Sequence, residues 1–147
     1  MNKYFKYFTV LLAVTLMFNC EQDNDSSLSN FVGFQEGPLN FTVDNGQTQT
    51  FDVVVAASET SSSDRSYTVV VDDASTLASP YSVPATVTIP GGSNVGTLSI
   101  SVTDNDDLGF VAQSLVLDFP DEAGMDFGDA VTLNFTETCL DTIVTLE

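Results

Sequence analysis

From residue 31 onward, hydrophobic and polar positions alternate along this chain with a period of two. In residues 96–103, for example, Leu98, Ile100 and Val102 alternate with threonine and serine. Successive side chains of a strand point to opposite faces, so this run predicts a strand with one apolar face and one polar face. Runs of the same kind are residues 31–34, 39–43, 48–57, 66–71, 85–89, 114–119 and 130–135.

Glycine, proline, asparagine and aspartate separate these runs, and no sustained helical stripe follows the first 30 residues. Seven or eight short strands at regular spacing, with turn residues between them, are typical of two packed antiparallel sheets. The pattern therefore predicts an all-β fold, an antiparallel β-sandwich with its apolar residues between the sheets. The threonine and serine of the outer faces follow from β-propensity alone.

The first 20 residues carry a different pattern. Lys3 and Lys6 precede an apolar run over residues 8–18, and Cys20 follows, ahead of a polar and acidic stretch. The apolar run is too short to span a bilayer comfortably as a helix. The arrangement resembles a bacterial lipoprotein signal, and the acidic residues after the cysteine resemble those of surface-exported lipoproteins of the Bacteroidota. An ordinary cleaved signal peptide or an N-terminal anchor helix is the alternative interpretation.

The lipoprotein resemblance implies cleavage before Cys20 and acyl chains, such as palmitate, on that cysteine. More than one acyl chain anchors a protein stably to a membrane that it does not span. We therefore expect a signal peptide over residues 1–19, a lipidated cysteine and flexible acidic tether over residues 20–30, and a folded domain over residues 31–138. The expected location is the outer membrane, at the cell surface or at the periplasmic face.

The chain is strongly acidic. The full sequence has 21 acidic and three basic residues, a net charge of −18. Loss of Lys3 and Lys6 with the signal peptide makes the charge −20 and leaves Arg65 as the remaining basic residue. A protein of this charge repels nucleic acid and anionic lipid headgroups, which excludes DNA and RNA as partners.

The residue types that many enzymes use are missing. The sequence has no histidine, only two cysteines and no glycine-rich phosphate loop. Ser-His-Asp and Cys-His catalysis and histidine-containing zinc sites are therefore excluded. We expect no enzymatic activity. A carboxylate-pair glycan hydrolase is the weakest alternative, because a small sandwich with short loops leaves little room for a deep cleft.

Several landmarks follow one another in a distinctive order. Phe-Gln-Glu-Gly at residues 34–37 stands ahead of a strand, Tyr81 precedes Thr-Ile-Pro-Gly-Gly at residues 88–92, and Asp-Asn-Asp-Asp follows at residues 104–107. This order resembles the Calx-beta module, a sandwich found in bacterial surface proteins and in calcium-regulated exchangers. The resemblance covers about residues 30–136 and implies an immunoglobulin-like β-sandwich.

The same resemblance implies calcium ligands from a glutamate near the first strand, a mid-domain loop and the aspartates that follow the strand after the Pro-Gly turn. Asn105 replaces one of those aspartates. Pro80 stands where many members have an acidic residue, so the mid-domain ligands would come from a loop that folds back. Calcium takes six to eight oxygen ligands, which carboxylates and carbonyls at one end of a sandwich can supply. The implied ligands are Glu36, Asp72, Asp73, Asp104, Asp106 and Asp107. The alternative is that the aspartates of residues 104–107 only stabilise a tight turn.

Taken with the anchor, this resemblance implies a binding or adhesion module with an extracellular protein or glycan as ligand and membrane contact through Cys20. A structural spacer without a metal site is the alternative. Residues 139–147 alternate again and predict an extra edge strand or the start of a truncated second domain. Within them Thr142 lies in Asp-Thr-Ile, which resembles an O-glycosylation motif of the Bacteroidota, and Cys139 is interpreted as a small buried hydrophobic residue.

Overall fold

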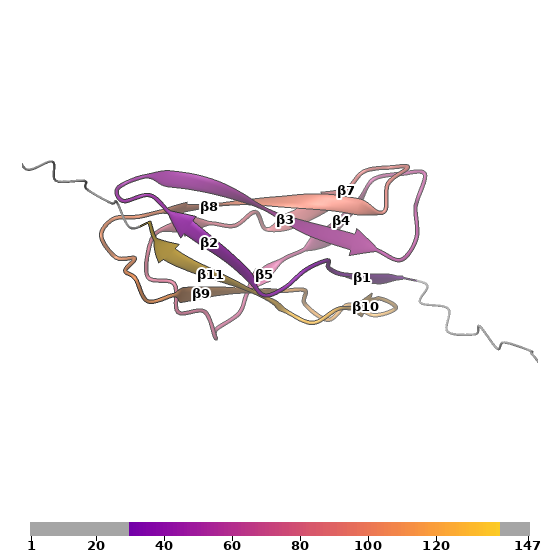
Figure 1. Ribbon diagram of the computed structural model, residues 1–147. Helices are drawn as coiled ribbons and strands as arrows, with labels where there is room; N and C mark the ends of the chain where they lie inside the picture. Colours follow the sequence, from indigo (N-terminus) through magenta and orange to yellow (C-terminus); the bar gives the residue numbers. More distant parts are fainter. Residues whose placement is uncertain (1–29, 139–147) are drawn as a thin grey trace, which may run out of the picture.

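The computed structural model describes residues 30–138, which form eleven β-strands (Figure 1). Cys20, Cys139, Thr142 and the expected signal peptide lie outside the described residues, as does the strand expected after residue 138. The expectations for these segments stay predictions. The strands are β1 (Phe31–Phe34), β2 (Leu39–Val43), β3 (Thr48–Ala57), β4 (Arg65–Thr68), β5 (Val70–Val71), β6 (Tyr81–Ser82), β7 (Thr86–Ile89), β8 (Val95–Thr103), β9 (Gln113–Asp118), β10 (Asp126–Phe127) and β11 (Val131–Glu137).

Two main sheets pack against each other as a sandwich (Figure 1). One has five strands in the order β10-β1-β3-β8-β6, and the other has four in the order β2-β11-β9-β5. Strands β4 and β7 form a small antiparallel pair beside β8. The all-β sandwich expected from the alternation is therefore confirmed.

Two pairings are parallel rather than antiparallel. Strand β1 runs parallel to β10, and β2 runs parallel to β11 along five residues. The chain changes sheets between β1 and β2, and again between β10 and β11, so the two crossing segments lie next to each other. A period-two pattern marks each strand but carries no information on the direction of its neighbour.

The single strand predicted over residues 66–71 is wrong. It is divided into β4, which pairs with β7, and β5, which pairs with β9 in the four-stranded sheet. Val69 lies between them, where its N–H donates to the carbonyl oxygen of Ala85 at 2.9 Å and its side chain is buried. The chain thus passes from one layer to another within a run that reads as one strand.

The core lies between the two main sheets. On β8 the side chains of Leu98, Ile100 and Val102 are 1%, 0% and 0% exposed, which confirms the inner face predicted from the sequence. Phe135 of β11 contacts Phe41 of the neighbouring strand β2 and, across the core, Phe51 of β3, with ring centroids 5.4 and 5.5 Å away. A second aromatic group, nearer β10, consists of Phe34, Phe119, Phe127 and Tyr67.

Within residues 30–138 the structure contains no helix that is long and apolar enough to cross a membrane.

Candidate functional site

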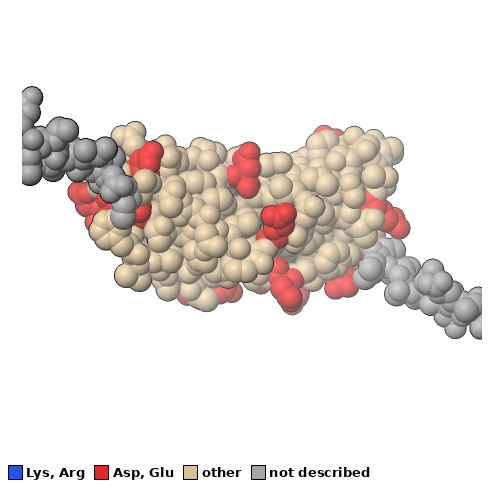
Figure 2. All heavy atoms as spheres, viewed as in Figure 1, with Lys and Arg blue, Asp and Glu red and all other residues tan. Residues whose placement is uncertain are grey.

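Acidic and amide side chains gather at the end of the sandwich where β2, β8 and β11 finish (Figures 1 and 2). Three segments meet there: the turn of residues 44–47, the loop of residues 104–112 and the end of β11. Backbone hydrogen bonds join them, from Asp104 N–H to Gln47 O at 2.9 Å and from Glu137 N–H to Gly109 O at 3.0 Å. We call this region the acidic end, and it comprises Asp44, Asn45, Asp104, Asp106, Asp107 and Glu137.

Asp104 is the buried member of the acidic end. Its side chain is 0% exposed, and neither carboxylate oxygen has a hydrogen-bond partner among the described residues. Burying an ionised carboxylate without hydrogen bonds or a counter-charge is costly.

Ser79, two residues before β6, supplies another oxygen without a hydrogen-bond partner among the described residues. It is 1% exposed, and its Oγ has no hydrogen-bond partner in the described part of the chain. Strand β6 pairs antiparallel with β8, and Thr103 N–H continues that ladder by donating to Pro80 O at 2.8 Å. The next opposed pair along this register is Ser79 and Asp104, and side chains of opposed residues lie on the same face of a sheet. The register thus places Ser79 and Asp104 at neighbouring positions, although no hydrogen bond joins their side chains.

Asn45 joins two more carboxylates at the surface of the acidic end. Its side-chain Nδ2 donates to Asp106 Oδ1 at 3.3 Å and to Glu137 Oε1 at 2.9 Å. Glu137 lies 92 residues from Asn45 in the sequence, and β2 and β11 bring them together because they run in parallel. Neither residue belongs to the set implied by the sequence.

The loop after Asp104 also shows the turn chemistry that the sequence left as an alternative. Asp106 has a φ of 62°, in the left-handed region that Asp adopts more readily than most residues. The backbone carbonyl of Asp107 accepts a 2.6 Å hydrogen bond from Gln113 Nε2, and Leu108 is buried. These contacts fix the loop over the acidic end.

Arg65, the one basic residue among residues 30–138, lies far from the acidic end. Its guanidinium donates to Glu59 O at 2.8 Å and to Ser93 O at 3.2 Å, near the start of β8. Asp104 follows the end of β8, whose nine residues span about 30 Å. No basic side chain of the described chain therefore neutralises the acidic end, and Figure 2 shows acidic residues without basic ones on the face it displays.

The structure does not bring the six implied calcium ligands together. Glu36 lies in the crossover between β1 and β2, and Asp72 and Asp73 follow β5. The Oδ1 of Asp72 accepts the N–H of Ala74 at 2.8 Å, so this carboxylate stabilises its own turn. Within residues 30–138 no three acidic, histidine or cysteine side chains form a group that could hold a metal ion. The loop of Asp72 does not fold back towards Asp104 because residues 72–77 continue beside β9, with hydrogen bonds to Val116 and Ser114.

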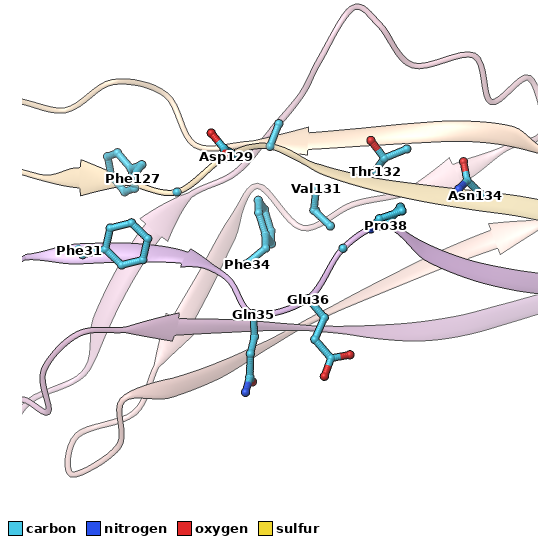
Figure 3. Close-up of a pocket in the computed structure, with 13 residues that line it drawn as sticks. Phe31, Phe34, Gln35, Glu36, Pro38, Phe127, Asp129, Val131, Thr132 and Asn134 are labelled. Atoms are coloured by element: carbon cyan, nitrogen blue, oxygen red, sulfur yellow. The ribbon is translucent and has the colours of Figure 1, made fainter.

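A groove of about 820 Å³ is the second feature that could hold a ligand (Figure 3). It runs along β1, the crossover of residues 35–38 and the chain from β10 into β11. We call it the β1–β11 groove. Aromatic, carboxylate and amide side chains line it, among them Phe31, Glu36, Phe127, Asp129, Thr132 and Asn134.

The distal part of the Phe31 ring packs against two glycines of the groove. A Cβ atom added at Gly33 or at Gly128 would stand 3.1 Å from Phe31 Cζ, which is too close for an ordinary contact. The Phe31 ring therefore packs against glycine backbone. It lies on the side of β1 opposite to the core residue Val32. The partly exposed ring of Phe31 also borders a second hollow of about 590 Å³.

Most of the polar side chains that line the groove take part in no hydrogen bond among the described residues. None of the hydrogen bonds found within residues 30–138 uses the side chains of Gln35, Glu36, Asp129 or Thr132. In Figure 3, Gln35 and Glu36 point to one side of the crossover, while Asp129 and Thr132 lie on the other. Asn134 differs, because it hydrogen-bonds to Asn40 and Ser114 at 3.0 and 2.9 Å.

No protein-family model and no curated protein sequence matches this chain. Among solved structures, it is similar to the apo form of the Calx CBD1 domain, with 16% sequence identity and a TM-score of 0.56. The match covers 74% of this chain and 97% of that domain. The described domain is a Calx-beta-like β-sandwich. At this level of identity the match defines the fold and assigns no function.

The chain is also similar to solved structures of proteins from Bacteroides ovatus. A protein of unknown function has 16% identity and a TM-score of 0.61, and the match covers 77% of this chain and 46% of that one. A putative carbohydrate binding protein has 16% identity and a TM-score of 0.51, with 71% and 36% covered. The chain thus spans less than half the length of either protein.

Proposed function

We propose that this chain is a non-enzymatic, lipid-anchored binding module of the cell envelope whose acidic end holds a calcium ion. The observation that carries the proposal is the pair of buried residues at that end. Asp104 and Ser79 present three side-chain oxygens that have no hydrogen-bond partner within residues 30–138. Calcium is a hard cation that takes oxygen ligands of both kinds, carboxylate and neutral.

The residues that would hold the ion differ from those implied by the sequence. Asp104 and Ser79 would form the buried part. Asp106 and Glu137, which share the amide of Asn45, would have to move towards Asp104 to bind the same ion, because no three carboxylates form a group within residues 30–138. Ser79 precedes Pro80, the position at which many Calx-beta modules have an acidic ligand. Here a neutral hydroxyl stands beside that position, which favours weak binding, because fewer charged ligands give a lower calcium affinity.

The binding role is supported by the β1–β11 groove, which combines exposed aromatic and polar side chains in the way that ligand sites do. A glycan is the ligand class that we favour, since one of the fold relatives is a putative carbohydrate binding protein. A spacer is the competing function. It is favoured by the position of the described ends, because the chain enters beside β1 and leaves at the opposite end, after β11 (Figure 1).

Thermal unfolding of the full chain in detergent tests the calcium site. Calcium at 10 mM should stabilise the fold by about 1.4–2.7 kcal/mol if its Kd is about 10⁻⁴–10⁻³ M, the range of extracellular modules. Magnesium at equal concentration is the control for charge screening, which stabilises so acidic a protein without a site. Equal shifts with the two ions would contradict the calcium site and favour the spacer.

A further inference from the structure

We infer that the β1–β11 groove binds an uncharged sugar ring, stacked on Phe31. The inference rests on the proposed role as a binding module, and it is independent of the calcium site. The groove lies along β1 and β10, whereas the acidic end lies where β2, β8 and β11 finish.

The first argument is the aromatic surface. The distal atoms of the Phe31 ring lie against the backbone of Gly33 and Gly128, and the partly exposed ring lines the groove. The face of an aromatic ring carries partial negative charge. The C–H groups on one face of a pyranose ring are weakly positive and nearly coplanar, so they complement an exposed aromatic face. Gly33 and Gly128 are required here because a Cβ at either position would push the ring away from the sheet.

The second argument is the kind of hydrogen bond that the groove offers. Glu36 and Asp129 both carry exposed carboxylates, and an ionised carboxylate only accepts hydrogen bonds. Gln35 and Thr132 can both donate and accept. A ligand that matches this set must bring several donors and a few acceptors, which the hydroxyl groups of a sugar provide.

The third argument is charge. The β1–β11 groove is lined by two carboxylates and by no basic residue, and the chain without its signal has a net charge of −20. These charges repel uronic-acid, sulfated and phosphorylated glycans. A single cationic group could not engage both carboxylates, because Glu36 and Asp129 lie on opposite sides of the crossover (Figure 3). A neutral oligosaccharide that lies across the crossover can reach both.

Titration calorimetry with the full chain tests this inference, in a detergent without a sugar headgroup. The neutral probes are the hexamers of cellulose, maltose, mannose and chitin. An oligogalacturonate is the anionic probe, and chitosan hexamer and a lysine-rich peptide are the cationic probes. We expect binding of at least one neutral hexamer and no binding of the oligogalacturonate.

Three variants locate that binding. Phe31→Ala should weaken the affinity by at least about tenfold, and Phe31→Tyr, which keeps the ring, should preserve it. Tyr81→Ala is the matched control, because Tyr81 is an exposed aromatic residue on β6, at the other edge of the same sheet. Its affinity should equal that of the unmodified chain.

The double variant Glu36→Gln/Asp129→Asn covers the case in which Phe31→Ala fails to fold, since both of its side chains are exposed. This variant should also weaken the binding of the neutral hexamer, because amides replace two carboxylates that would accept hydrogen bonds from the sugar. Absence of binding by every neutral hexamer would overturn the inference. The inference would also be overturned if a neutral hexamer still bound to both Phe31→Ala and the double variant. Binding of the cationic probes alone would overturn it as well. A calcium-specific shift in melting without sugar binding would leave the proposed calcium site in place and reject only the sugar site.

Discussion

At the residue scale, the calcium site that we propose at the acidic end depends on the carboxylate of Asp104. The sequence marked this residue through the Asp-Asn-Asp-Asp run, but it did not indicate which aspartate would be buried. Its partner Ser79 was not predicted, because one serine in a serine-rich chain carries no signal. Asn45 and Glu137 were also missed, since their contact depends on the parallel pairing of β2 with β11. Only the three-dimensional register reveals such contacts.

In chelator, Asp104→Asn should raise the stability of the fold. The substitution keeps the shape of the side chain and removes an ionised group that has no hydrogen-bond partner within residues 30–138. We expect a gain of at least about 1 kcal/mol, because a buried amide costs less than a buried unpaired charge. Urea unfolding measures this gain. The matched control is Asp121→Asn, an exposed change of the same charge that should have little effect.

At the element scale, long strands could be predicted and short ones could not. The nine residues of β8 repeat the apolar–polar alternation often enough to define an inner face. Strands β6 and β10 have two residues each, which is too few to show a period. The passage of the chain from one sheet to another at Val69 could not be predicted either, because the sequence does not distinguish buried from exposed valines in a continuous apolar run. The sequence therefore defines the fold class and the face of each long strand, while the layer changes follow from tertiary packing.

Ile100→Asp should prevent stable folding. Ile100 is 0% exposed and stands opposite Phe51 of β3, so the variant would place a carboxylate in the core without a partner. The loss should exceed about 4 kcal/mol, which few domains of this size survive. Circular dichroism and denaturant unfolding measure the outcome. Thr97→Asp, an exposed change on the same strand, should remain folded, and a folded Ile100→Asp variant would show that the register of β8 is wrong.

At the scale of the whole molecule, the sandwich is long and polarised. Its described chain begins beside β1 and ends beyond β11 at the opposite end, which is the acidic end (Figure 1). The ten residues of β3 correspond to about 33 Å along this axis. An anchor at Cys20 would place the end near β1 towards the membrane and the acidic end away from it.

Cys20→Ser tests the anchor on which that orientation depends. The variant should lose incorporation of labelled palmitate and move from the membrane fraction to the soluble fraction, since lipid chains are the proposed attachment. Its melting temperature should stay unchanged, because the described sandwich is formed by residues 30–138 and Cys20 precedes them in the sequence. A variant that remains in the membrane fraction would contradict the lipoprotein hypothesis and support an N-terminal anchor helix.

The most direct measurement is the calcium-induced shift in melting temperature, compared between the full chain and its Asp104→Asn variant. The account predicts a rise of several degrees in the unmodified chain with calcium, a smaller rise with magnesium, and equal small rises with both ions in the variant. If the calcium-specific rise in melting temperature persisted in the Asp104→Asn variant, the calcium ion would have to bind at another site. The absence of a calcium-specific rise in both proteins would show that the buried carboxylate does not hold a cation.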